Sequence, residues 1–288
     1  MKTASIKTVI RVGLLASLAA LAGGGNAKAQ GAEPPARFET FADWCIHKPQ
    51  LTLAARHTVN LLLAEAETQN CAQAQATLSS LTELSLDEVA IADITPLSSL
   101  THLTGLSLSN NEISDVSPLA PLTNLIWLSL GNNHLEDVAP LSGLTDLIVL
   151  QLGGNDIEDV EPLASLGELI ILELGSNHIT DVTPLASLRD LTRLQLGRNA
   201  IADLAPLVNL TKLVWLSLSR NAISDVAPLA SLTNLEELSL SDNDIADATP
   251  LTSLTNLAYL NLKGNPLDDL TCPVEPQTIC KWAASNPW

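Results

Sequence analysis

The sequence is short of basic residues and of aromatic residues. It has 14 Lys and Arg against 32 Asp and Glu, so its net charge is −18, and only 3% of its residues are aromatic. A surface of this sign repels polyanions, which excludes nucleic acid and anionic membranes as main partners. Solubility explains much of the excess acid, although cationic partners remain compatible with it.

Motifs for catalysis and for metal binding are also missing. The chain has no phosphate-binding loop, no paired catalytic carboxylate motif and no nucleophile elbow. Its cysteines do not have the Cys-x-x-Cys spacing that is typical of zinc sites. We therefore expect a protein that is not an enzyme and that holds no cofactor and no metal.

No apolar run is long enough to cross a membrane comfortably. The run over 12–22 follows three basic residues and precedes Ala27-Lys28-Ala29, a pattern typical of a signal peptide. We predict that residues 1–29 are removed on export to the periplasm or the medium, with an uncleaved N-terminal anchor as the alternative. Gly24 stands where a lipoprotein box requires cysteine, which argues against a lipid anchor. No stable membrane insertion is expected after cleavage.

What the sequence contains in abundance is one repeated frame. Its best example is Leu125-x-x-Leu128-x-Leu130-x-x-Asn133-x-Leu135-x-Asp137-Val138-x-Pro140-Leu141, and the asparagine recurs every 22 residues. A period of this length predicts a stack of equivalent units around one continuous core. The function of such a solenoid is expected on an extended surface. The recurring asparagines are Asn111, Asn133, Asn155, Asn177, Asn199, Asn221, Asn243 and Asn265.

The frame Leu-x-x-Leu-x-Leu-x-x-Asn-x-Ile resembles the signature of leucine-rich repeats. The Asp-Val-x-Pro-Leu ending is similar to the 22-residue internalin-like class of bacterial secreted proteins. The resemblance implies an α/β solenoid, an arc with a concave parallel β-sheet and a convex side of short 3-10 helices or turns. Members of this family bind other macromolecules on the concave sheet. Because neither an Ig-like module nor a sorting tail follows the repeats, a wall-anchored invasin is not expected.

These patterns divide the chain into four parts. They are a signal peptide (1–29), a linker with a helical N-terminal cap (30–80), nine repeats (81–270) and a C-terminal cap (271–288). Helical spacing predicts helices over 51–66 and 69–78, and an earlier short helix that carries Phe38, Phe41 and Trp44. We expect the first cap to cover the apolar end of the repeats, although a separate functional domain is an alternative.

Four cysteines lie just outside the repeats, as expected for an oxidising compartment. Cys45 and Cys71 precede the array, and Cys272 and Cys280 follow it. Of the three possible pairings the two local disulfides are favoured, because the ends of nine stacked units lie about 40 Å apart. Free thiols are the alternative.

Two polar positions of the frame are assigned to the scaffold. The asparagine amide both donates and accepts, so it is expected to bridge the backbones of adjacent units. An aspartate precedes each proline by three residues, which favours capping of a short helical turn, with calcium binding as the alternative. The aspartates are Asp115, Asp137, Asp159, Asp181, Asp203, Asp225 and Asp247.

One outward-facing strand position is expected to carry the binding information. Between Asp87 and Pro266, every aromatic residue lies in this column. Exposed aromatic and apolar residues with a nearby arginine are typical anchors of protein interfaces. The alternative is a cross-strand ladder that only stiffens the sheet. The predicted anchors are Trp127, Val149, Ile171, Arg193, Trp215 and Tyr259.

A local excess of basic residues lies beside that column. It consists of Arg189, Arg193, Arg198, Lys212 and Arg220. Arg198 and Arg220 stand just before their asparagines and are predicted at the exit edge of the sheet. They would suit an acidic or sugar-acid partner, and charge balancing in an acidic protein is an equal alternative.

The sequence thus predicts an exported, non-catalytic protein that binds a protein partner on a concave sheet. A cell-envelope glycan is the first alternative, because aromatic faces also stack on sugars. A purely structural envelope protein is the second.

Overall fold

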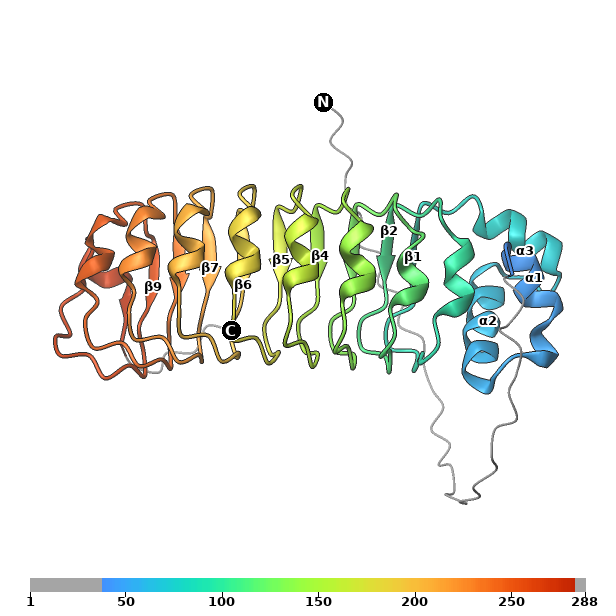
Figure 1. Cartoon of the computed structure of the whole chain (residues 1–288), viewed down its shortest axis with the longest axis horizontal. Coiled ribbons are helices and arrows are strands. Elements are labelled where there is room, and N and C mark those ends of the chain that lie inside the picture. Colours follow the sequence, from blue (N-terminus) through green and yellow to red (C-terminus); the bar gives the residue numbers. More distant parts are fainter. Residues whose placement is uncertain (1–37, 283–288) are drawn as a thin grey trace, which may run out of the picture. The chain divides into compact units, whose positions relative to one another are not determined.

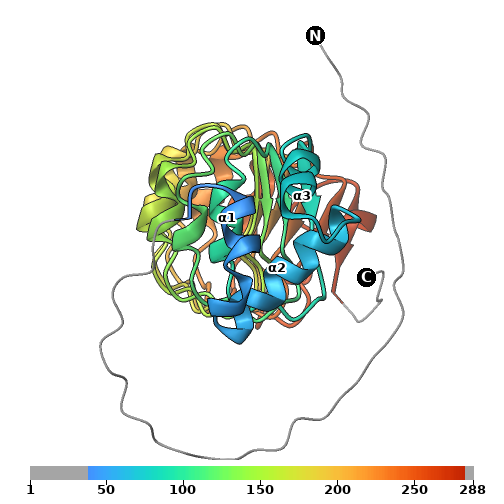
Figure 2. The ribbon, with the colours of Figure 1, turned by 90° about the vertical axis from the view of Figure 1, so that its right-hand side faces the viewer.

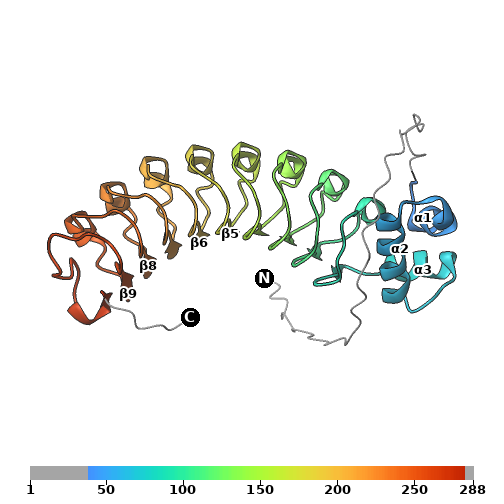
Figure 3. The same ribbon diagram turned by 90° about the horizontal axis from the view of Figure 1, so that it is seen from below.

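The computed structural model describes residues 38–282 of the chain. The predicted signal peptide, the linker that precedes the helical cap, and residues 283–288 of the predicted C-terminal cap lie outside this range. The described unit is an arc whose inner side is a single sheet of ten parallel strands in sequential order (Figures 1 and 3). The predicted solenoid architecture is therefore confirmed.

Nine three-residue strands occupy the same place in successive repeats. They are β1 (Glu83–Ser85), β2 (Gly105–Ser107), β3 (Trp127–Ser129), β4 (Val149–Gln151), β5 (Ile171–Glu173), β6 (Arg193–Gln195), β7 (Trp215–Ser217), β8 (Glu237–Ser239) and β9 (Tyr259–Asn261). Neighbouring strands pair exactly one repeat apart, so that Trp127 is opposite Val149. Every side chain of a strand therefore has its equivalent directly beside it on the next strand.

Each of these strands is only three residues long. Extended structure ends because the residue before each asparagine turns into the left-handed region, as Asn132 does with φ of 55°. The backbone ladder nevertheless continues past the strand. Leu130 donates to the carbonyl of Gln151, and Asn132 donates to that of Gly153, both at 2.8 Å. The turn thus ends the strand without leaving its amides unpaired.

The recurring asparagines bridge adjacent repeats as predicted. Asn133 is only 5% exposed. Its Nδ2 donates to the carbonyls of Leu108 and Leu130, each at 3.0 Å. Its Oδ1 accepts from the amide of Ile113, also at 3.0 Å. One side chain therefore satisfies three backbone groups that would otherwise be buried and unpaired.

The convex side consists of short 3-10 helices with proline in the first turn (Figure 3). They are η2 (Thr95–Ser99), η3 (Ser117–Leu119), η4 (Ala139–Gly143), η5 (Glu161–Ser165), η6 (Thr183–Ser187), η7 (Ala205–Asn209), η8 (Ala227–Ser231) and η9 (Thr249–Ser253). Asp137 Oδ1 accepts from the amide of Ala139 at 2.7 Å. The N-cap residue is Val138, however. The predicted capping bond therefore has the form of an Asx turn that begins one residue earlier.

The core is one continuous cluster of aliphatic side chains. Within a repeat such as 125–146, the side chains of Leu128, Leu130, Leu135 and Leu141 are completely buried. Each such leucine stabilises the fold by about 1.5–3 kcal/mol relative to an exposed position. Equivalent leucines of neighbouring repeats extend this core along the whole array.

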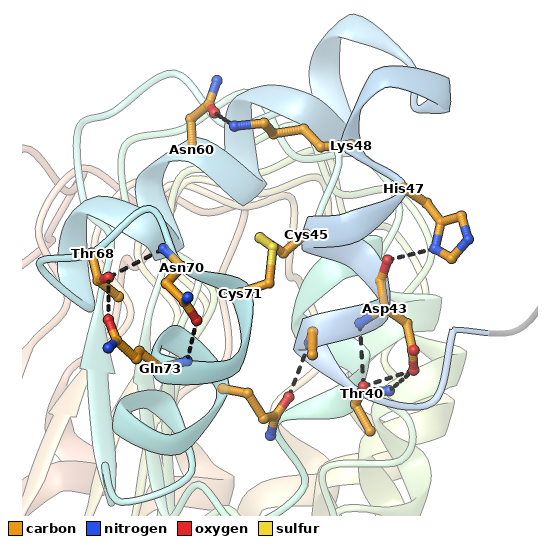
Figure 4. Close-up of a disulfide and its surroundings, with 12 residues drawn as sticks. Thr40, Asp43, Cys45, His47, Lys48, Asn60, Thr68, Asn70, Cys71 and Gln73 are labelled. Carbon is orange, nitrogen blue, oxygen red and sulfur yellow. Dashed lines mark hydrogen bonds between the residues drawn. A yellow bond between two sulfur atoms is a disulfide. The ribbon is translucent and has the colours of Figure 1, made fainter.

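Helices α1 (Phe41–Ile46), α2 (Leu53–Glu65) and α3 (Cys71–Leu78), together with η1 (Lys48–Gln50), precede the repeats. Phe38, which we expected on the first helix, lies before it, because Thr40 caps α1 by accepting from the amide of Asp43. Cys45 and Cys71 form a disulfide that links α1 to α3 (Figure 4). Among residues 38–282, no helix has the length and apolar character that a membrane crossing requires.

These helices lie over the first repeat (Figure 2). Phe41, Leu62 and Leu78 are fully buried and belong to the same core as the repeats. Two polar groups of α2 also reach the array. Thr58 Oγ1 donates to the carbonyl of Asp93 at 2.6 Å, and His57 Nε2 lies 2.7 Å from that of Val89. The helices therefore cover apolar surface that the first repeat would otherwise expose.

The C-terminal end contains a strand that the sequence frame does not predict. After η10 (Gln277–Ile279), strand β10 (Cys280–Lys281) pairs in parallel with β9. A second disulfide joins Cys272 to Cys280, so both predicted local pairings are present. Val274 and Ile279 are buried against the last repeat. Because this segment lacks the leucine frame, its pairing could not be recognised from periodicity.

Candidate binding surface on the concave sheet

The structure brings the predicted anchors together in one ladder across the concave sheet. The register places Trp127, Val149, Ile171, Arg193, Trp215, Glu237 and Tyr259 side by side on β3 to β9. All but Glu237, which is exposed, are partly buried. The ladder therefore presents apolar area to solvent while its side chains also contact their neighbours.

Two of these neighbour contacts fix the tryptophans. Trp127 leans over Gly105 of the preceding strand, where a Cβ atom would collide with the indole ring. The guanidinium carbon of Arg193 lies 4.0 Å from the centroid of the Trp215 ring. Arg193 Nε is also 3.7 Å from a carboxylate oxygen of Glu173. Both tryptophans are thus held in place before any partner binds.

A second apolar column borders the ladder, and sequence reasoning missed its exposure. Ile126, Ile148, Ile170 and Val214 stand one residue before the anchors and are 36–43% exposed. Their β-branched character is also what a strand prefers, so the sequence pattern alone gave no reason to assign them to the surface. In three consecutive repeats an exposed isoleucine therefore precedes Trp127, Val149 or Ile171, which adds exposed apolar area next to the ladder.

A cavity of about 520 Å³ opens at the C-terminal half of the ladder. Trp215, Glu237 and Tyr259 line it, and its other lining residues include Ser217, Ser239 and Asn261. Burial raises the pKa of Tyr259, and the nearby Glu237 carboxylate raises it further. The only sequence signal for this cavity was the small polar residue two positions along each strand from Trp215, Glu237 and Tyr259.

A shallower and more polar recess of about 360 Å³ lies towards the exit edge of the sheet. It follows the glycines that come two residues after the strands, including Gly131, Gly153 and Gly175. Gly131 and Gly153 carry no side chain and are partly exposed, whereas Gly175 is buried against the side chain of Gln195. The recess offers hydrogen-bonding groups and little apolar area.

The predicted basic edge is largely neutralised. Lys212 lies 2.6 Å from Asp190, and Arg220 lies 3.5 Å from Asp242. Arg198 and Arg220 have left-handed backbones with φ of 58° and 59°, which places them on the turn after the strand. Within the part of the chain that the structure describes, Arg198 and Arg189 have no salt bridge. These pairs favour the charge-balancing interpretation for most of the group.

The aspartates that recur in each repeat accept hydrogen bonds from the backbone. From Asp115 to Asp247 each carboxylate accepts from the amide two residues further on, at 2.7–2.8 Å. The hydroxyl and the amide of Thr183 together lower the pKa of Asp181. Over residues 38–282, no three His, Cys, Asp or Glu side chains gather in a way that could hold a metal ion.

Comparison with known proteins agrees with this geometry. The family model described as "Leucine Rich repeats (2 copies)" matches residues 79–121, 123–165, 211–248 and 233–273, which together span just over half of the chain. The chain belongs to the leucine-rich-repeat family. No curated protein matches it in sequence.

Solved structures indicate which class of leucine-rich-repeat proteins this chain is similar to. Internalin C2 from Listeria monocytogenes is 38% identical, with 70% of this chain and 91% of that chain covered and a TM-score of 0.66. The functional domain of InlJ from Listeria monocytogenes shares the fold at 23% identity, with 85% and 63% covered and a TM-score of 0.50. The protein is thus a bacterial leucine-rich-repeat protein of the internalin-like class.

A plant receptor shows the same fold in a complex. The ectodomain of the receptor kinase GASSHO1/SCHENGEN3 from Arabidopsis thaliana, in complex with CASPARIAN STRIP INTEGRITY FACTOR 2, is 28% identical. The similarity covers 67% of this chain and 25% of that chain, with a TM-score of 0.57. The leucine-rich-repeat fold is commonly a scaffold for protein–protein interaction, and its internalin-like members are typically binding proteins rather than enzymes.

Proposed function

We propose that this protein binds a protein partner on its concave sheet, outside the cytoplasm. The observation that carries the proposal is the column of apolar side chains on β3 to β5, together with the exposed isoleucine that stands just before each of these strands. Ile126 with Trp127, Ile148 with Val149, and Ile170 with Ile171 form a contiguous patch on a rigid sheet. Patches of this kind on soluble proteins mark interaction sites, and aromatic residues at their centre usually dominate the affinity.

A preformed arc suits such binding because little conformational entropy is lost on docking. Trp127 and Trp215 are already held by Gly105 and Arg193, so their rotamers need no ordering. Export is supported by the two disulfides, which persist in oxidising compartments, and by the predicted signal peptide at 1–29. The destination would be the periplasm or the medium.

Affinity capture tests this proposal. The mature protein and its Trp127→Ala/Trp215→Ala variant would be immobilised and exposed to native envelope extract and medium. We expect a partner that the wild type retains and the variant loses, with affinity lower by at least about 30-fold, since hot-spot residues contribute about 2 kcal/mol or more each.

The matched control is Leu53→Ala/Leu270→Ala, because these apolar side chains are 81% and 66% exposed and lie outside the concave sheet. This control variant should capture the same partner as the wild type. Circular dichroism would show whether the tryptophan variant stays folded. If it unfolds, the ladder serves to stiffen the sheet, and identical captures by the folded variant would contradict concave-face binding.

A further inference from the structure

The cavity between β7 and β9 has walls that differ from the rest of the concave sheet. Trp215, Glu237 and Tyr259 are direct register neighbours on β7, β8 and β9. Strands lie about 4.8 Å apart, so the two aromatic residues flank the carboxylate with their backbones about 10 Å from each other. A side chain that enters above Glu237 would therefore have an aromatic residue on either side, and aromatic rings attract cations.

The charges around this cavity leave one carboxylate uncompensated. Arg193 also lines the cavity, but it already pairs with Glu173 and covers one face of the Trp215 ring. In the part of the chain that the structure describes, Glu237 has no salt bridge. Glu237 is close enough to Tyr259 to raise the pKa of that hydroxyl. The cavity therefore has a negative charge between two aromatic residues and no unpaired cation among its lining residues.

We propose that this cavity receives one lysine or arginine side chain of the protein partner. The aliphatic part of that side chain would lie between Trp215 and Tyr259, and its charged end would meet Glu237. The inference rests on the proposed function and adds the chemistry of one anchor point. The acidic protein, with its net charge of −18, also attracts a basic partner at a distance.

Other occupants fit the cavity less well. An acidic side chain would approach the unpaired carboxylate of Glu237, which is repulsive. A neutral apolar side chain would bury that carboxylate without a counter-charge, which carries a desolvation cost. A sugar would stack on the rings and could donate hydroxyl groups to Glu237, but a neutral sugar would not neutralise the carboxylate. Only a cation both contacts the rings and neutralises that charge.

Short peptides test this chemistry directly. The probes would be blocked pentapeptides of glycine that differ only in the central residue, which is lysine, arginine, norleucine, citrulline or glutamate. NMR would follow the indole signal of Trp215, assigned with Trp215→Phe, and the ring signals of Tyr259. We expect saturable shifts with the lysine and arginine peptides, at least about tenfold tighter than with norleucine or citrulline.

Two substitutions of adjacent glutamates provide the matched comparison. Glu237→Gln should reduce the affinity of the lysine peptide to that of the norleucine peptide. Glu236→Gln removes the same charge one residue earlier, at an exposed position that does not line the cavity, and should change the affinity little. Equal binding of lysine and norleucine peptides, tighter binding of the glutamate peptide, or no saturable shift with any peptide would each overturn the proposal. Shifts produced by a chitin oligosaccharide alone would assign the cavity to a glycan.

The two proposals can fail separately. If Glu237→Gln captures the same partner as the wild type with equal affinity while Trp127→Ala/Trp215→Ala does not, the cation site is wrong and concave-face binding stands. If the peptides show the expected selectivity but no captured protein depends on the tryptophans, the cavity chemistry stands and the proposed protein partner is wrong.

Discussion

Among single residues, each recurring asparagine connects two repeats through one amide group. Asn155 donates to the carbonyls of Leu130 and Leu152 at 3.0 and 2.9 Å and accepts from the amide of Leu135 at 3.1 Å. Asn155→Ala leaves these groups buried and unpaired, so we expect a loss of about 1–3 kcal/mol in the free energy of unfolding, measured by urea titration. Asn234→Ala is the control.

Asn234 also donates to a carbonyl of the neighbouring repeat, that of Thr211 at 2.8 Å, but it is exposed. Water replaces the lost bond there, so the expected loss is at most a few tenths of a kcal/mol. Equal losses at both positions would show that burial of the amide is unimportant.

Gly105 shows how a residue without a side chain positions an anchor. A Cβ at this position would collide with the indole of Trp127. Gly105→Ala should therefore displace the ring, reduce its contact with the sheet and lower stability by about 1–3 kcal/mol. Thermal unfolding together with tryptophan fluorescence would measure both effects.

Gly143→Ala serves as the comparison, because a Cβ there meets no atom within 4 Å. It should leave stability and fluorescence almost unchanged. Trp127→Ala should remove most of the cost of Gly105→Ala, since the colliding ring is gone. If the double variant is as unstable as the sum of the single ones, the collision is not the cause.

Among the elements, the N-terminal helices depend on a covalent link as well as on packing. The Cys45–Cys71 disulfide closes a loop with a sequence separation of 26. From the chain-entropy relation, Cys45→Ala/Cys71→Ala should lower stability by about 3.5 kcal/mol. Because repeats contact only their neighbours, hydrogen exchange should increase in α1, α3 and the first repeat and remain slow in β5 and β6.

The corresponding change at the other end is Cys272→Ala/Cys280→Ala. That disulfide spans a sequence separation of 8, so the same relation gives about 2.5 kcal/mol, with faster exchange confined to β9 and β10. Uniform acceleration of exchange along the whole array in either variant would contradict local stabilisation.

Elements that are built from the repeat frame could be predicted from the sequence, whereas strand β10, which lies outside the frame, could not. The frame predicted the strands, the asparagine bridges and the convex turns, because the same residue types recur in the same places. It did not predict β10, since Cys280 and Lys281 lack the frame. It also did not distinguish exposed from buried β-branched residues, so the exposure of Ile126 was missed. The cavity at Trp215 depends on three neighbouring strands at once, which a pattern within one repeat does not describe.

At the scale of the whole molecule, neighbouring strands always pair one repeat apart. The distance between any two anchors is therefore a multiple of the spacing between adjacent strands. Deleting residues 158–179 removes one complete unit of 22 residues and joins Ile157 to Thr180 in the same frame. We expect a folded protein with unchanged circular dichroism per residue. Trp127 and Trp215 would be about 4.8 Å closer, so a partner that contacts both should bind at least about tenfold more weakly in the capture assay.

The deletion also removes Ile170 and Ile171 of the proposed patch, and Ile170→Ala/Ile171→Ala is therefore the necessary control. A large loss with the deletion and a small loss with the substitution would show that spacing matters. Equal affinity of the deletion variant and the wild type would mean that the partner contacts only one part of the arc.

The last strand has a consequence for solubility at high concentration. A parallel sheet that ends in an unpaired strand is a template for pairing with another chain, and a stack of identical strands could extend into a fibre. β10 occupies the outer edge of β9, is only two residues long and is tethered by Cys272–Cys280. β10 therefore covers the edge of β9, and reduction of the disulfide, which weakens its hold there, would favour self-association through that edge.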